Sequence, residues 1–127
     1  MLDLLHIENI AIIEQADIAF RPGFNALTGE TGAGKSIVID ALSAVLGQRA
    51  SRELIRTGAD HAFVSAVFSH IPEGLGEDLG VADAQEWLLQ REIYTDGKNV
   101  CRCNGRPMTV TQLRTLGSRL LNIHGQH

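Results

Sequence analysis

Apolar and polar residues alternate along much of this 127-residue chain, which is the spacing of strands that bury one face. The alternation predicts strands at 2–8, 12–20, 62–68, 88–95 and 100–103. Turn pairs close several of these segments, namely Pro22-Gly23, Asp96-Gly97 and Asn104-Gly105. Two shorter segments, the mostly apolar 24–28 and residues 121–124, are also predicted to be strands. We therefore expect a sheet with hairpin connections.

Two other segments have helical character. Residues 37–46 are apolar almost all round, interrupted by Asp40 and Ser43, and Gly47 follows them. This pattern predicts a buried helix with a glycine at its C-terminal cap. A second helix is predicted from capping candidates at 109–112 to about Leu120. Its apolar face consists of Val110, Leu113, Leu116 and Leu120.

The segments between these elements are polar. Residues 48–58 carry Arg49, Arg52 and Arg56, and a short helix is predicted within them. The arginines suit contacts with nucleic-acid phosphates, and equally a solvated face that pairs with Glu53 and Asp60. Residues 72–83 are rich in glycine and acidic side chains, which predicts a surface loop.

Length and composition narrow the possibilities further. The chain is long enough for one domain with a real core, and its net charge of −4 argues against a general nucleic-acid binder. No apolar run approaches the ~20 residues of a membrane span, and the N-terminus lacks the basic region of a signal peptide. We therefore expect a cytoplasmic protein that does not associate with a membrane. Cys101 and Cys103 would share one strand face, as reduced structural thiols.

Residues 29–36 fit the phosphate-binding pattern G-x-x-x-x-G-K-[ST], the P-loop. Its glycines let the backbone turn so that N–H groups surround phosphate oxygens, and the following helix favours anions at its N-terminus. Lys35 would contact the β- and γ-phosphates, and the Ser36 hydroxyl would bind Mg²⁺. The residues expected to hold a nucleotide are Gly29, Glu30, Thr31, Gly32, Ala33, Gly34, Lys35, Ser36 and Ile37. A predicted strand precedes this loop and a helix follows it, as the motif requires.

A complete hydrolytic site also needs a buried strand that ends in a carboxylate. The only run of four apolar residues that ends in an acid is 10–14, and it precedes the P-loop, so Glu14 is better interpreted as an exposed strand residue. Gln126 can ligate Mg²⁺ or water through its amide oxygen, although a terminal glutamine is usually solvated surface. His124 and His127 lack further ligands, which argues against a metal site between them. The chain therefore carries a phosphate cradle without a full catalytic site.

Three stretches together resemble the N-terminal head segment of the bacterial RecN family of DNA repair proteins, which are SMC-like ATPases. They are LHIENIAII at 5–13, LTGETGAGKSIVIDAL at 27–42 with LGQRA at 46–50, and IHGQH at 123–127. The hairpin region with REI at 91–93 also matches. The resemblance covers nearly the whole chain.

The resemblance implies an α/β fold of the P-loop NTPase class: an N-terminal lobe of an ABC/SMC-type head, with a mixed β-sheet around the P-loop helix and an antiparallel β-subdomain. Residues 1–127 would be that lobe, from Walker A to Q-loop, whereas the coiled coil and the C-terminal lobe are absent. Gln126 matches the Q-loop position, so it is expected to reach Mg²⁺ and the attacking water. Lys35 and Gln126 are then the candidate catalytic residues, and Ser36 and Gln126 the candidate metal ligands.

The same resemblance implies function and partners. The parent protein would hydrolyse ATP to ADP and phosphate in recombinational repair of DNA double-strand breaks, and ATP would close two heads into a homodimer. Partners would be DNA, through the whole protein and with Arg52 or Arg56 as candidates, and the C-terminal lobe of the same chain; the location would be the nucleoid. Ala11 departs from the basic residue that many relatives carry there.

Two other functions fit a P-loop on the residues alone. One is a small-molecule kinase, which predicts a carboxylate strand and an arginine-rich lid after the loop. The other is an ABC-type binding or scaffold module that does not turn over nucleotide. On the first interpretation, the isolated fragment binds nucleotide weakly and is catalytically inactive.

Overall fold

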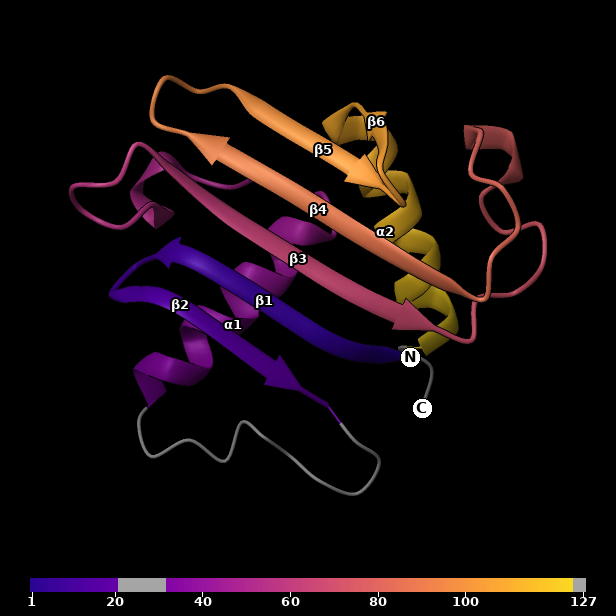
Figure 1. Cartoon of the computed structure of the whole chain (residues 1–127), viewed down its shortest axis with the longest axis horizontal. Coiled ribbons are helices and arrows are strands. Elements are labelled where there is room, and N and C mark those ends of the chain that lie inside the picture. Colours follow the sequence, from indigo (N-terminus) through magenta and orange to yellow (C-terminus); the bar gives the residue numbers. More distant parts are fainter. Residues whose placement is uncertain (21–31, 125–127) are drawn as a thin grey trace.

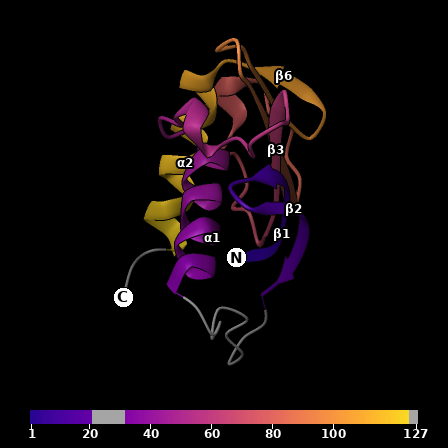
Figure 2. The same ribbon diagram turned by 90° about the vertical axis from the view of Figure 1, so that its left-hand side faces the viewer.

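One antiparallel sheet underlies the part of the chain that the computed structural model describes, residues 1–20 and 32–124. Its six strands follow the order β2-β1-β3-β4-β5-β6, and every pairing among them is antiparallel. Both long helices lie on the same side of this sheet (Figures 1 and 2). The elements are β1 (Leu2–Ile10), β2 (Ile13–Ala19), α1 (Gly32–Val45), η1 (Arg52–Leu54), β3 (His61–Ser69), η2 (Glu77–Leu79), β4 (Glu86–Tyr94), β5 (Asn99–Cys103), β6 (Arg106–Met108) and α2 (Val110–His124).

The core fills the space between the sheet and the two helices. Alternate residues of β3 and β4 point to the helices, because successive strand side chains face opposite sides. These positions include Ala62, Val64, Ala66, Trp87, Leu89 and Ile93, all buried. Helix α2 contributes Leu113, Leu116 and Leu120, each at most 1% exposed, as its predicted apolar face requires. Burial of one such leucine stabilises the fold by about 1.5–3 kcal/mol.

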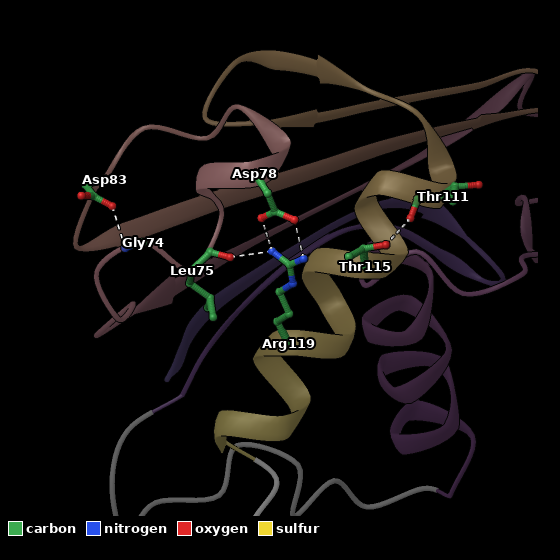
Figure 3. A network of polar contacts seen from close by, with 7 residues as sticks. All are labelled: Gly74, Leu75, Asp78, Asp83, Thr111, Thr115 and Arg119. Atoms are coloured by element: carbon green, nitrogen blue, oxygen red, sulfur yellow. Dashed lines mark hydrogen bonds and ion pairs between the residues drawn. The ribbon is translucent and has the colours of Figure 1, made fainter.

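The turns follow the predicted chemistry. Asn104 and Gly105 have φ of 52° and 81°, the left-handed pair that a tight hairpin needs, and Gly97 has φ of 93°. The loop at 72–83 is also a surface segment, but it is held in place. Arg119 of α2 donates two hydrogen bonds to the Asp78 carboxylate, at 2.7 and 2.8 Å, and one to the Leu75 carbonyl at 2.7 Å (Figure 3).

The far end of α1 meets α2 at two glycines. Gly47 has φ of +88°, and its N–H donates to the Ala44 carbonyl, so it caps α1 as predicted. A Cβ at Gly117 would lie 2.2 Å from the Leu46 carbonyl oxygen, and one at Gly47 would lie 2.3 Å from the Arg114 nitrogen. The two helices therefore approach more closely here than any side chain would permit.

Two predictions about the elements need correction, and one strand was not predicted. Residues 121–124 are not a strand, because α2 continues through Gly117 and runs on to His124. Helix α1 is not buried all round in the described structure, because Ile39 and Asp40 are exposed on its outer face. Strand β6 was not predicted, and its three residues pair with β5 after the Asn104-Gly105 turn. The predicted strand at 24–28, with the mixed sheet expected around it, lies outside the described residues.

Candidate nucleotide-binding site

Helix α1 begins at Gly32, inside the predicted phosphate-binding loop. Lys35 and Ser36 lie in its first turn and are exposed, and Ile37 is half-buried. Val38 and Ala41 are buried and pack the helix onto the sheet. The first turn of a helix presents backbone N–H groups and the positive end of its dipole, which suit phosphate oxygens. Gly29, Glu30, Thr31 and Gln126 lie outside the described residues, so their predicted roles stay predictions.

A polar stripe runs from this turn along the outer face of α1. Ser36, Asp40 and Ser43 are spaced by four and three residues, so they lie on one helical face over about 10 Å. The stripe ends at an open pocket of about 410 Å³. Its lining comes from three parts of the chain: Ala11; Asp40 and Ser43; and Arg49, Ala50, Ser51, Glu53 and Leu54.

Backbone contacts hold the walls of this pocket together. The Ala11 N–H donates to the Leu54 carbonyl at 2.8 Å, and the Arg56 N–H donates to the Asn9 carbonyl at 2.9 Å. Asn9 and Ala11 have φ of 56° and 52°, so the connection from β1 to β2 bends sharply toward η1. The Ser51 hydroxyl accepts a hydrogen bond from the Glu53 N–H and caps η1. The pocket wall is therefore a fixed part of the fold.

Arg91, on the helix-facing side of β4, is the buried charge nearest to this helix's far end. Its Nη1 donates to the Ala44 carbonyl at 2.8 Å and to the Gln48 carbonyl at 2.6 Å, and its Nε donates to Asn99 Oδ1 at 2.9 Å. Burial lowers the pKa of the guanidinium. Sequence reasoning missed Arg91 as a functional candidate. The sequence does contain a signal for it: Arg91 shares the alternating strand positions of Trp87, Leu89 and Ile93, so a charged residue falls on the apolar face of the strand.

The other charged candidates have local partners. Arg52 Nη1 donates to the Thr95 carbonyl at 3.2 Å, and Asp60 pairs with His61 at 2.6 Å. The two ring nitrogens of His6 lie 2.5 Å from Glu8 and 2.6 Å from Asp17. The hydrogen bond with Glu8, followed by that with Asp17, raises the pKa of His6. Glu14 is exposed, as its interpretation as a strand residue predicts.

Cys101 and Cys103 are buried on one face of β5, as predicted, and both are free thiols. Burial raises the pKa of Cys103 to about 11 and also raises that of Cys101. Among residues 1–20 and 32–124, no group of three or more His, Cys, Asp and Glu side chains is arranged to hold a metal ion. None of the described helices is long and apolar enough to span a membrane.

Comparison with known proteins places this geometry in a family. Residues 4–99 match the AAA domain family. The chain belongs to that family. The chain is 45% identical to the DNA repair protein RecN of Bacillus subtilis, and the alignment covers all of this chain and 23% of the length of that protein. It is 43% identical to RecN of Vibrio cholerae, over all of the chain and 24% of that protein.

The fold of the AAA domain chain also matches a solved structure. The match is an SMC ATPase from work on ATP-driven dimerization and DNA-stimulated activation, with a TM-score of 0.75 and 26% identity over 94% of this chain and 79% of that one. The resemblance to RecN proteins and the ABC/SMC-type fold class are therefore confirmed. The chain spans about a quarter of the length of the curated relatives that it matches.

Proposed function

We propose that residues 1–127 are the ATP-binding N-terminal lobe of a RecN-like ATPase that acts in recombinational repair of DNA double-strand breaks. The observation that carries this proposal is the start of α1 inside the phosphate-binding motif, with Lys35 and Ser36 exposed in its first turn. The similarity to RecN proteins over the full chain supports the repair role. The similarity to RecN proteins does not favour the alternative of a small-molecule kinase.

Each motif residue has a proposed part in holding Mg²⁺-ATP. The loop at 29–34 surrounds the phosphates with backbone N–H groups, and Ile37 continues the helix behind it. Lys35 contacts the β- and γ-phosphates as a positive charge. The exposed Ser36 hydroxyl fits a hard cation, and Gln126 supplies an amide oxygen to the cation and the attacking water. Mg²⁺, when bound, neutralises charge that develops on the phosphates.

The nucleoside part of ATP has a proposed place in the 410 Å³ pocket beside α1. The stripe of Ser36, Asp40 and Ser43 leads from the phosphate end to this pocket, over a length that suits a nucleotide. Ile12, which is 82% exposed next to Ala11, would add an apolar surface at the pocket's edge. The small side chain of Ala11 leaves room there.

The remaining partners follow from exposed surfaces. Ile39, Leu121 and Ile123 expose apolar area on the outer faces of α1 and α2, which suits coverage by a C-terminal lobe of the same protein. That lobe would supply the missing carboxylates, and ATP would join two such heads into a homodimer. DNA would bind to the whole protein in the cytoplasm, with Arg52 or Arg56 as contact candidates.

Nucleotide assays on the purified chain test this function. We expect calorimetry to detect weak binding of ATP with Mg²⁺ and no steady hydrolysis, because half of the site lacks groups that stabilise the transferring phosphoryl charge. Steady hydrolysis that is abolished by Lys35→Ala would contradict the proposal that this chain holds only half of the catalytic site. Phosphate transfer to small acceptors would favour a kinase, and absence of binding even with the partner lobe supplied would favour a scaffold.

A further inference from the structure

The C-terminal end of α1 is held by side chains from other elements. Arg91 reaches from β4 to the Ala44 and Gln48 carbonyls, and Arg114 Nε of α2 donates to the Gly47 carbonyl at 3.2 Å. The last carbonyls of a helix have no partners within the helix and carry its negative dipole end. A guanidinium therefore suits this place, and Arg91 is only 3% exposed.

These contacts bear on the other end of the helix. Ala44 lies nine residues after Lys35, and nine residues of α-helix span roughly 14 Å as a stiff rod. A shift or tilt at Ala44 is therefore transmitted to the first turn, where Lys35 and Ser36 lie. Because Leu46 lies so close to Gly117, α2 has no room to move and compensate for a shift of α1.

The same side chain also holds the pocket wall. Gln48, whose carbonyl accepts from Arg91, directly precedes Arg49, Ala50 and Ser51, which line the pocket. One guanidinium thus joins β4 to two of the three parts of the chain that line the pocket, helix α1 and the segment that begins at Arg49. Asn99 accepts from Nε at the start of β5 and fixes the orientation of the guanidinium plane.

We infer that Arg91 is a positioning residue for the nucleotide: it fixes the far end of α1 and the start of the 48–51 wall, and thereby sets where Lys35 and Ser36 meet the phosphates. This rests on the proposed ATP site. Arg91 touches no phosphate in this role, because it acts through the backbone carbonyls of Ala44 and Gln48.

The test compares three variants of the whole chain. Arg91→Met removes all the donors and keeps an unbranched apolar side chain, whereas Arg91→Lys keeps the positive charge but lacks the planar set of guanidinium donors. Arg102→Met is the matched control, because Arg102 lies on the adjacent strand β5 and faces Glu92 on the other side of the sheet. The readouts are the Kd for Mg²⁺-ATP and amide hydrogen exchange along α1 and β3.

For Arg91→Met we expect ATP affinity to fall about tenfold, as for the loss of charged hydrogen bonds, and exchange to rise along α1 while β3 stays protected. Arg91→Lys should fall between Arg91→Met and the wild type, and Arg102→Met should match the wild type. If Arg91→Met does not fold, Arg91→Lys decides: wild-type affinity or wild-type exchange in α1 overturns the inference.

The outcomes also separate this inference from the proposed function. A wild-type chain that binds no ATP would refute the proposed site, and unchanged exchange along α1 in Arg91→Lys would independently refute the anchoring. Faster exchange in α1 with unchanged ATP affinity would show a purely structural arginine, and would overturn the positioning role.

Discussion

Single residues in this chain separate by burial into those that hold the fold and those available to a ligand. Lys35 is exposed at the start of α1, whereas Arg91 is buried at its end. Lys35 belongs to α1 and Arg91 reaches the helix from β4, and of these two cations only the exposed Lys35 can meet a phosphate. Removal of Lys35 should therefore affect binding with little effect on folding.

Lys35→Ala is expected to weaken binding of Mg²⁺-ATP by about ten- to a hundredfold, since a charge-assisted hydrogen bond contributes about 1.5–3 kcal/mol. The free energy of unfolding should change by less than about 0.5 kcal/mol, because the side chain is exposed. Calorimetry and urea unfolding measure the two effects. If the wild type and Lys35→Ala bind Mg²⁺-ATP with equal affinity, Lys35 does not belong to the binding site.

His6 gives the chain a pH-dependent contact between β1 and β2. Glu8 and Asp17 raise its pKa, so the protonated imidazole is favoured in the folded state. Its contribution is complete below about pH 6.5, the unfolded value, and is lost as pH rises through the higher folded pKa. We expect the wild type to lose more stability than His6→Gln between pH 6 and 8.5 in urea unfolding.

His70→Gln serves as the control for that comparison, because His70 contacts the Ser69 hydroxyl and not a carboxylate. Its loss of stability over the same pH range should equal that of the wild type. A His6→Gln protein with the same pH dependence as the wild type would contradict the role given to Glu8 and Asp17.

At the scale of elements, the sequence predicted what local spacing determines. The alternation at 62–68 and the Asn104-Gly105 turn specified β3 and the hairpin after β5, because side-chain period and φ > 0 residues act locally. Residues 121–124 were predicted to be a strand because two apolar residues that alternate with two polar ones fit a short strand as well as the end of a helix. Only the helix preceding them, packed on the sheet, decides between the two.

The candidate site also has a part that local sequence predicts and a part that it does not. The motif at 29–36 is contiguous, so the sequence alone located Lys35 and Ser36. The pocket combines Ala11 with Asp40 and Ser51, and Arg91 reaches carbonyls more than 40 positions away in the chain. Such contacts depend on strand register and helix placement, which the pattern of one segment does not contain.

Helix α2 offers a direct test of predicted capping. Thr109 and Gln112 exchange hydrogen bonds, from the Gln112 N–H to Thr109 Oγ1 and from the Thr109 N–H to Gln112 Oε1, both at 3.0 Å. Thr109→Ala should lower the free energy of unfolding by about 1 kcal/mol, because it exposes unpaired N–H groups. Urea unfolding measures this, and Thr111→Ala, at an exposed position inside the helix, should cost much less.

On the scale of the whole molecule, the acidic segment is joined to α2 by Arg119. This side chain holds both the Asp78 carboxylate and the Leu75 carbonyl, and its hydrogen bonds lower the pKa of Asp78 (Figure 3). Arg119→Met should free the 72–83 loop, so limited proteolysis should cut there several times faster while the melting temperature changes little. Glu77→Gln, on the same loop, should be cut at the wild-type rate.

The two thiols on β5 allow the local opening of this part of the fold to be measured. Cys101 and Cys103 are buried between the sheet and α2, and the pKa of Cys103 is raised to about 11, so neither access nor ionisation favours alkylation of the folded chain. Each labelling event must therefore wait until β5 and β6 part from the helix. The rate of thiol modification, followed by mass, should thus report how often this edge of the lobe opens, without any dye or engineered probe.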